Sequence, residues 1–301
     1  MIISVGNITM GGTGKTPFVM MIGEYFLSKG NKVCVLSRGY KGQIGYETNV
    51  LSDGEKIYFI PPLAADEPYL IASRLKSAVV ITGKDRTKGY EIGLKRYHCD
   101  TFILDDGFQH KRMKRDVDIL LLDHNNPLST GLVFPFGYLR EFPSAIKRAD
   151  IVVFNKAEEE KIPDRVHKFI KGKPVFFSNY ILKGFFSANK NITNKEIATE
   201  KCVAFSGIAN NRLFFRMLER NGINLTKTYS FKDHHIYSEP EIENIVKKSN
   251  GQIIITTEKD FVKIPDKYAN SIYFAKIQVK MNDYELFFKT IEEVYKKKQP
   301  V

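Results

Sequence analysis

The chain has 301 residues, 43% of them hydrophobic, which is long enough for two ordinary domains with filled cores. Forty-six Lys and Arg against 34 Asp and Glu give a net charge of +12, which favours an acidic partner: a nucleotide, a nucleic acid or an anionic lipid surface. Three widely spaced cysteines argue against a disulfide framework or a zinc cluster, no apolar run approaches the roughly 18 to 20 residues that span a bilayer, and no signal peptide is predicted.

Short runs of Val, Ile and Leu recur along the first half of the chain, with helical segments between them. The runs are residues 2–5, 32–36, 78–81, 101–104, 119–122 and 151–154. Because they are continuous rather than alternating, they predict a parallel sheet that is buried on both faces. Residues 16–29 have apolar side chains at spacings of three and four and end at Gly30, which predicts the first helix.

A glycine-rich segment lies between the first predicted strand and the first helix. The pattern G-x-x-x-x-G-K-[ST] of phosphate-binding loops has glycine where this chain has Thr9. Glycines let backbone N–H groups point at a phosphate, and the helix adds its positive N-terminal end. The alternative is a plain glycine-rich turn, which the order strand, loop, Gly-Lys-Thr and helix disfavours. We therefore expect a nucleotide site made of Gly11, Gly12, Thr13, Gly14, Lys15 and Thr16, with the Lys15 ammonium on phosphate oxygens and the Thr16 hydroxyl on Mg²⁺.

Three acids lie at predicted element ends. Asp66 precedes a helix at residues 69–75, a position that taken alone is typical of a helix cap. Asp105 and Asp106 end a strand, where an acid of a phosphate-loop protein can hold Mg²⁺ or its water. Two adjacent carboxylates are costly unless a cation shares them, so we favour a site over the alternative of a solvated turn.

Basic residues follow several of the predicted strands: Arg38, Lys84, Arg86 and Arg140. Each one alone is typical of a solvated surface charge. The carboxyl ends of successive parallel strands meet at one edge of a sheet, where ligands bind. A ligand site at this edge, lined by these residues, is therefore the alternative to solvated surface charges.

The second half of the chain repeats the pattern on a smaller scale. Residues 179–200 are polar and rich in Asn and Lys, which predicts a linker after a first domain at residues 1–178. Strands are predicted at 203–205, 228–231, 253–256 and 272–275, and helices at 211–220 and 240–248. We expect an α/β protein with a P-loop NTPase-like parallel-sheet domain and a second, smaller α/β domain at residues 201–301, whose amphipathic segment 283–297 docks back on the first domain.

Two adjacent histidines, His234 and His235, follow a strand of the second domain. On an extended segment, neighbouring side chains point to opposite sides, so at most one of the two faces a cleft. A surface pair or half of a metal site are alternatives. The lack of further His or Cys nearby argues against the metal.

Seven motifs, spread over nearly the whole chain, carry a family resemblance. They are Gly-Asn-Ile-Thr-Met-Gly-Gly-Thr-Gly-Lys-Thr-Pro at 6–17, Ser-Arg-Gly-Tyr at 37–40, Asp-Glu-Pro at 66–68, Leu-Asp-Asp-Gly-Phe-Gln-His at 104–110, Phe-Ser-Gly-Ile at 205–208, Asp-His-His at 233–235 and Thr-Glu-Lys-Asp at 257–260. Together they resemble the tetraacyldisaccharide 4'-kinases of lipid A biosynthesis, in which threonine is common at the position of Thr9. The resemblance implies transfer of phosphate from ATP with Mg²⁺ to the 4'-hydroxyl of tetraacyldisaccharide 1-phosphate, in a cleft between the two domains.

The resemblance also implies roles for single residues. Asp66 would accept the proton of the sugar hydroxyl, made more basic by a histidine of the Asp-His-His motif, and we favour His234 over His235. The dyad would assemble when the domains close over ATP. The metal would be surrounded by Glu67, Asp105, Asp106 and Glu141 in addition to Thr16. Phosphate or substrate would be supported by Arg38, Arg86, His110 and Arg140.

Family members work at the cytoplasmic face of the bacterial inner membrane, so a peripheral membrane contact is expected. They usually carry an N-terminal extension that contacts the membrane, whereas here the first predicted strand begins at residue 2. Either the start is trimmed or the lipid is held elsewhere. The candidate is the apolar loop at 132–139 beside Arg140, and burial of that loop in the core is the alternative.

Two other functions are alternatives to the one that the resemblance implies. A GTPase switch would use Asn-Lys-x-Asp to bind guanine, but residues 155–158 end in Glu158, and residues 105–107 lack the D-x-x-G spacing. A nucleic-acid-binding ATPase would use the positive charge, but no RNA- or DNA-binding module is recognisable. We expect no nucleic-acid partner and infer no obligate protein partner.

Overall fold

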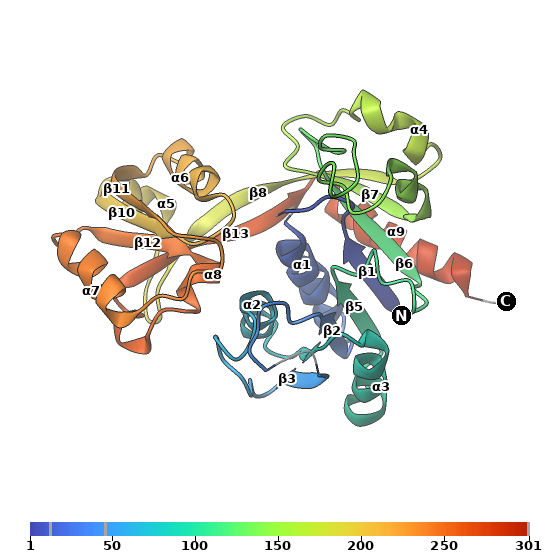
Figure 1. The fold of residues 1–301 in the computed structure, drawn as a ribbon, viewed down its shortest axis with the longest axis horizontal. Coiled ribbons are helices and arrows are strands. Elements are labelled where there is room, and N and C mark those ends of the chain that lie inside the picture. The colour runs from blue at the N-terminus through green and yellow to red at the C-terminus, as the bar shows by residue number, and fades with distance from the viewer. Residues whose placement is uncertain (12–13, 45–46, 300–301) are drawn as a thin grey trace. The chain divides into compact units, whose positions relative to one another are not determined.

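The structure is a computed structural model that describes residues 1–11, 14–44 and 47–299 (Figure 1). The chain divides into two compact units. The larger unit comprises the described residues of Met1–Phe59, Ile71–Tyr180 and Val279–Val301. The smaller unit comprises Ile60–Leu70 and Ile181–Gln278.

The larger unit is built on a mostly parallel sheet with the strand order β8-β7-β6-β1-β5-β2-β4-β3. Its strands are β1 Ile2–Gly6, β2 Val33–Ser37, β3 Asn49–Asp53, β4 Val79–Thr82, β5 Thr101–Asp105, β6 Val117–Asp123, β7 Ile151–Asn155 and the first part of β8 Val175–Phe186. In this order, β3 is antiparallel to β4, and the pairs from β8 to β4 are parallel. The central strands are almost wholly buried, as continuous apolar runs predict for a parallel sheet.

Helices cover both faces of this sheet. They are α1 Lys15–Ser28, α3 Arg86–Tyr97, η1 Pro143–Arg148, η2 Asp164–Val166, α4 His167–Ile170 and α9 Tyr284–Lys298. The chain crosses the sheet in opposite directions in β1–α1–β2 and in β4–α3–β5, so right-handed crossovers place α1 and α3 on opposite faces. The last helix, α9, packs on α1, where the Tyr25 and Phe288 rings stack with centroids 3.7 Å apart. The Tyr25 hydroxyl also donates to the Glu292 carboxylate at 3.1 Å.

In the smaller unit, parallel strands pair in the order β11-β10-β12-β13 (Figure 1). Its strands are β10 Lys201–Ser206, β11 Asn224–Ser230, β12 Ile253–Thr257 and most of β13 Ile272–Met281, and β9 Asn191–Ile192 pairs with the end of β8. Its helices are α5 Asn194–Ala198, α6 Asn211–Arg220, α7 Glu239–Lys248, α8 Glu258–Phe261 and η3 Asp266–Tyr268. One core cluster joins Cys202 and Ala204 to α5 and α6, and the other joins Phe205 and Ile254 to α7. The predicted α/β class is thus confirmed in both units.

The observed division differs from the expected boundaries at 178 and 200. Residues 179–200 contain the second part of β8, β9 and α5 instead of a linker. The exposed side of these elements is polar, so the composition of the segment does not reveal that Phe185 and Ile197 are fully buried in the smaller unit. Residues 60–70, with the start of helix α2 Asp66–Arg74, also belong to the smaller unit, whereas α9 belongs to the larger one.

Candidate active site

The phosphate loop of the larger unit enters its turn through a short strand pairing. Thr9 forms an antiparallel bridge with Leu139, and the Met10 N–H donates to the Tyr138 carbonyl at 2.7 Å. Any L-residue can adopt this extended pairing, so the turn does not need glycine where the general pattern has one. The Thr9 hydroxyl accepts from the Asn7 amide at 3.4 Å. Of the expected loop residues, Gly12 and Thr13 lie outside the described part of the chain.

Both the backbone conformation and the surroundings of residue 14 require glycine there. Gly14 precedes α1 with φ 77°, a left-handed conformation that favours glycine. A Cβ there would lie 1.5 Å from the Tyr180 hydroxyl oxygen. That hydroxyl donates to the Gly14 carbonyl at 3.3 Å and accepts from the Asn155 amide at 2.5 Å. The hydroxyl of Tyr180 therefore anchors the end of the phosphate loop, and the first turn of α1 follows it with no acidic residue to oppose an anion.

Lys15 and Asp106 are neighbours in this unit. The Lys15 ammonium lies 3.5 Å from an Asp106 carboxylate oxygen and 3.5 Å from the Asn7 amide oxygen. The Arg140 Nη1 donates to both Asp106 oxygens, at 2.8 and 2.7 Å. Burial alone would raise the pKa of Asp106, but the charges of Lys15 and Arg140 outweigh it and lower the pKa. The Asp106 carboxylate is thus ionised and lies between two cations.

Asp105 has different partners from its neighbour. Its carboxylate accepts from the Ser37 hydroxyl at 3.0 Å, and its backbone carbonyl accepts from the Arg86 guanidinium at 3.1 Å. Arg86 is buried, whereas Arg38, which directly follows β2, is exposed. The strand ends after β2 and β5 and the start of α3 thus meet at one edge of the sheet.

Glu141 and Gln109 form a second polar group beside the loop. The Gln109 amide donates to the Asn7 carbonyl at 2.8 Å and to Glu141 at 3.2 Å. Both Glu141 oxygens accept from Arg148, at 2.9 and 2.8 Å. Burial raises the Glu141 pKa less than the hydrogen bond and charge of Arg148 lower it, so its pKa is below the usual value. The Glu141 carboxylate is engaged with these donors.

His110 is neutral at neutral pH. Burial, and next the charge of Arg86, lower its pKa below the usual 6.5. Its Nε2 is buried and has no hydrogen-bond partner among the residues that the structure describes. The ring therefore retains an unused donor or acceptor.

The acid expected to be the base, Asp66, lies in the smaller unit as the first residue of α2. His234 belongs to the same unit, so the expectation that the dyad assembles by closure of two domains is wrong. Its Oδ2 is 3.1 Å from the His234 Nδ1 and 3.5 Å from the Lys263 Nζ. Burial alone would raise the Asp66 pKa, but the His234 hydrogen bond and the charges of Lys263 and Lys259 lower it overall. The side chain is therefore an ionised, partly desolvated carboxylate.

His234 and His235 lie in a turn and not on an extended segment, yet their rings still face different partners. His234 has φ 63°, and its N–H donates to the Gly207 carbonyl at 3.0 Å. Its Nε2 lies 3.3 Å from the Lys259 ammonium, which can only donate, so Nε2 accepts and Nδ1 carries the proton toward Asp66. The His235 ring stacks on Phe231 at 4.6 Å, and its Nε2 pairs with a Glu241 oxygen at 3.1 Å.

Two lysines near Asp66 carried no role in the sequence prediction. Lys263 is 3% exposed, and its ammonium pairs with Asp260 at 2.9 Å and donates to the His235 carbonyl at 2.9 Å. Lys259 lies 3.3 Å from a Glu67 oxygen. The sequence contains a local signal for Lys263. Thr257 and Asp260 form a helix cap, and Lys263 follows Asp260 by three residues, a spacing that favours an ion pair. No local signal marks Tyr180, and the motif at residues 155–158 pointed to another role for Asn155.

The oxygen donors of the larger unit fit Mg²⁺. The described residues hold no group of three or more His, Cys, Asp or Glu arranged to bind a metal by themselves. Mg²⁺ needs less, because it usually keeps several waters and takes one or two carboxylates together with substrate phosphates. Thr16, in the first turn of α1, and Asp105 and Asp106, at the end of β5, offer a hydroxyl and carboxylates of the kind this ion prefers.

An exposed apolar loop follows this polar region in the chain. Four residues of this loop at 132–139, and Phe142 after it, are more than half exposed: Leu132 55%, Phe134 62%, Phe136 84%, Tyr138 61% and Phe142 71%. The loop is anchored by the buried Leu139, which bridges Thr9 and Val133. Across residues 1–11, 14–44 and 47–299, no helix has the length and apolarity needed to cross a bilayer.

Comparisons with known proteins agree with one another. A profile of the family "Tetraacyldisaccharide-1-P 4'-kinase" matches residues 1–296. The tetraacyldisaccharide 4'-kinase of Geobacter metallireducens is 38% identical over 268 residues, covering 87% of this chain and 78% of that protein. The enzyme of the same name from Desulfotalea psychrophila is 40% identical over 280 residues, covering 90% and 80%. The crystal structure of LpxK from Aquifex aeolicus in complex with ATP matches with a TM-score of 0.81 and 34% identity, covering 97% of this chain and 88% of that one.

Proposed function

The chain belongs to the tetraacyldisaccharide-1-P 4'-kinase family, and we propose that it transfers the γ-phosphate of ATP, with Mg²⁺, to the 4'-hydroxyl of tetraacyldisaccharide 1-phosphate. It is a kinase of lipid A biosynthesis, and the comparisons favour neither a GTPase switch nor a nucleic-acid-binding ATPase.

In this assignment the larger unit binds the donor. The backbone of the phosphate loop and the start of α1 surround the ATP phosphates, and Lys15 neutralises their oxygens. Asp106 keeps the Lys15 ammonium directed to the loop by an ion pair of 3.5 Å. Arg140, which pairs with Asp106, adds a second positive charge for the transferred phosphoryl group.

Mg²⁺ is assigned to Thr16, Asp105 and Asp106. When bound, the ion neutralises phosphate charge and orients the phosphates. Glu67 and Glu141 were also predicted to surround the ion, and this role stays a prediction. In the structure each is paired with a cation, Glu67 with Lys259 and Glu141 with Arg148.

The smaller unit supplies the base. The Asp66 carboxylate accepts the proton of the 4'-hydroxyl, and His234, whose Nδ1–H donates to Asp66, holds it in place. Lys259 keeps His234 in the tautomer that makes this hydrogen bond. His235 is bonded to Glu241 instead, so we assign the dyad to Asp66 and His234.

The acyl chains of the substrate need an apolar surface, and the exposed loop provides one. We assign Leu132, Phe134, Phe136, Tyr138 and Phe142 to the contact with lipid, at the cytoplasmic face of the inner membrane. Arg140 and the net charge of +12 favour anionic head groups at the same place.

The observation that carries the proposal is the hydrogen bond of 3.1 Å between Asp66 and His234, residues 168 positions apart, in a chain of this family. The test is incubation with ATP, Mg²⁺ and tetraacyldisaccharide 1-phosphate in detergent, followed by mass spectrometry of the lipid. We expect a product heavier by one phosphate group. Lys15→Ala should lower the rate at least about 100-fold, because a preorganised charge on the phosphates is lost.

The control is Lys95→Ala, since Lys95 is 76% exposed and pairs only weakly with Glu91 on the surface of α3. Its rate should stay within about twofold of the unaltered chain. Absence of product with the unaltered chain, or full activity of Lys15→Ala, contradicts the proposal.

A further inference from the structure

We propose that Lys263 positions the base of the reaction, an inference that rests on the proposed function. Its ammonium and the His234 ring hold the same oxygen of the Asp66 carboxylate, because Oδ2 lies 3.5 Å from the Lys263 Nζ and 3.1 Å from the His234 Nδ1. In the part of the chain that the structure describes, the hydrogen bond and the ion pairs of this carboxylate all reach Oδ2. The other oxygen, Oδ1, is therefore the one that is presented to the 4'-hydroxyl.

The Lys263 side chain has a fixed position because its partners surround it. The Nζ lies 2.9 Å from an Asp260 oxygen and donates to the His235 carbonyl at 2.9 Å. It also lies 5.3 Å from the centre of the Tyr237 ring, within the range of a cation–π contact. The side chain is 3% exposed, and that of Asp260 is fully buried. The ammonium therefore cannot turn to solvent without leaving a buried carboxylate unpaired, which is costly.

Asp260, the partner of Lys263, is itself held by neighbouring elements of the smaller unit. Its Oδ2 accepts from the Gly207 N–H at 2.9 Å and from the Thr257 hydroxyl at 2.7 Å. The Gly207 carbonyl in turn accepts from the His234 N–H at 3.0 Å. Gly207 thus connects the support of Lys263 to the backbone of His234. These contacts give a role to the Thr-Glu-Lys-Asp motif, for which the sequence predicted none.

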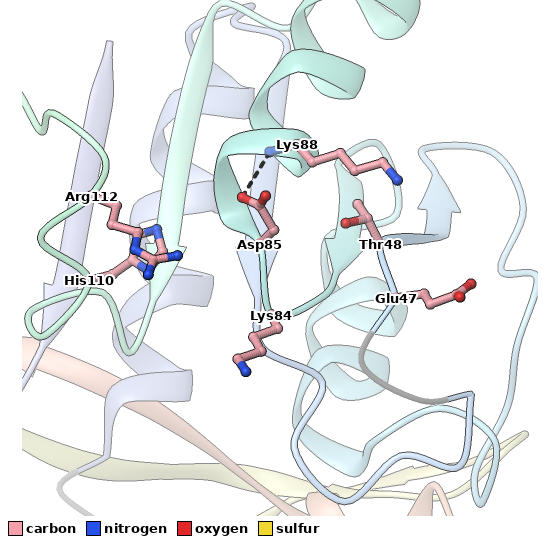
Figure 2. A pocket seen from close by; sticks show the side chains of 7 residues that line it. All are labelled: Glu47, Thr48, Lys84, Asp85, Lys88, His110 and Arg112. Atoms are coloured by element: carbon pink, nitrogen blue, oxygen red, sulfur yellow. Dashed lines mark hydrogen bonds between the residues drawn. The ribbon is translucent and has the colours of Figure 1, made fainter.

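Burial distinguishes Lys263 from lysines that can meet a ligand. Lys84 and Lys88 of the larger unit, for example, are exposed and line a cavity of about 460 Å³ (Figure 2). Lys263 has no such access to solvent, so we assign it to no phosphate oxygen. Its effect on the reaction passes through Asp66.

The charge of Lys263 does not make Asp66 a stronger base. A positive charge beside a carboxylate favours the ionised form and so lowers its affinity for a proton. What Lys263 adds to the rate is geometry, because a reacting group displaced by about 1 Å can lose on the order of 100-fold in rate. Lys263 is therefore a positioning residue, and its removal should lower kcat without weakening the binding of either substrate.

The test removes both charges of the buried pair, because Lys263→Met alone would leave the Asp260 carboxylate buried and unpaired. In this pair variant, Asp260→Asn, Lys263→Met, we expect kcat to fall about 10- to 100-fold, with KM for ATP and for the acceptor changed less than about twofold. In the Asp66→Asn background the same two substitutions should change kcat by less than about twofold, since the base that they position is already absent. The matched control is Glu239→Gln, Lys267→Met, which removes an exposed ion pair of the smaller unit and should leave kcat and KM unchanged.

The outcomes separate this inference from the proposed function. No transfer by the unaltered chain overturns both. If the unaltered chain is active, three results overturn the positioning role alone: a kcat of the pair variant within about twofold of the unaltered chain, a loss confined to KM, or an equal fold loss in the Asp66→Asn background. Circular dichroism and the Tm check that the pair variant is folded. If it is not, Asp260→Asn, Lys263→Gln, which keeps a donor for the His235 carbonyl, replaces it in the same measurements and is judged by the same results.

Discussion

Asp66 owes its chemistry to the side chains around it. A buried carboxylate normally has a raised pKa, but His234, Lys263 and Lys259 reverse the sign of the shift. A folded-state pKa below the usual value means that the carboxylate is charged through the neutral range and becomes protonated at a lower pH than a free aspartate. Asp66 is therefore in the charged form, free to accept a proton, at neutral pH. The expectation that His234 makes it more basic is wrong, because the hydrogen bond from His234 lowers the Asp66 pKa.

Asp66→Asn should lower kcat by about 10²- to 10⁴-fold, because the amide keeps the shape of the side chain but cannot accept the proton. His234→Ala should lower it by about 10- to 100-fold, since the base loses its hydrogen bond. His235→Gln should cost less than about fivefold, because that ring contacts Phe231 and Glu241. Steady-state kinetics with circular dichroism as a folding control measures all three, and an equal loss in the His234 and His235 variants would rule out the assignment.

At the scale of single elements, features formed by neighbouring residues can be predicted from the sequence, and contacts between distant residues cannot. The phosphate loop, its strand and its helix were predictable, because chain order and glycine chemistry define them within residues 2–28. The hydroxyl of Tyr180 on Gly14 was not, because 166 residues separate the two and only the sheet order joins them. The same holds for Lys263 beside Asp66, which are joined only in the folded smaller unit.

The apolar loop at residues 132–139, together with Phe142 after it, is the part of the chain that we assign to lipid. Two of its phenyl rings, Phe134 and Phe136, are 62% and 84% exposed, and burying each in a lipid surface is worth about 1.5–3 kcal/mol at most. The double variant Phe134→Asp, Phe136→Asp should therefore reduce binding to vesicles of phosphatidylglycerol and phosphatidylethanolamine by more than about tenfold. Co-sedimentation measures this binding.

The matched control is Leu94→Asp, since Leu94 is an exposed apolar residue of α3, outside the loop. It should bind vesicles like the unaltered chain. Equal binding of the double variant and the unaltered chain would remove the loop from the lipid contact.

For the molecule as a whole, the fold class and the parallel-sheet architecture can be predicted from the sequence, whereas the domain boundaries cannot. Continuous apolar runs identify buried parallel strands wherever they occur. The division depends on which strands pair, and β8 and β13 each run from one unit into the other. The polar composition of residues 179–200 comes from the exposed side of β8 and of the elements after it, and this composition resembles that of a linker.

Phosphoryl transfer from ATP to one hydroxyl of a two-sugar lipid is the central claim, and the position of the new phosphate tests it most directly. Two-dimensional ¹H–³¹P NMR of the purified product couples each phosphorus to the sugar proton beside it. The account predicts one new phosphorus signal coupled to H4' and an unchanged signal at H1. A new phosphate on any other carbon, or no new phosphate, would contradict it.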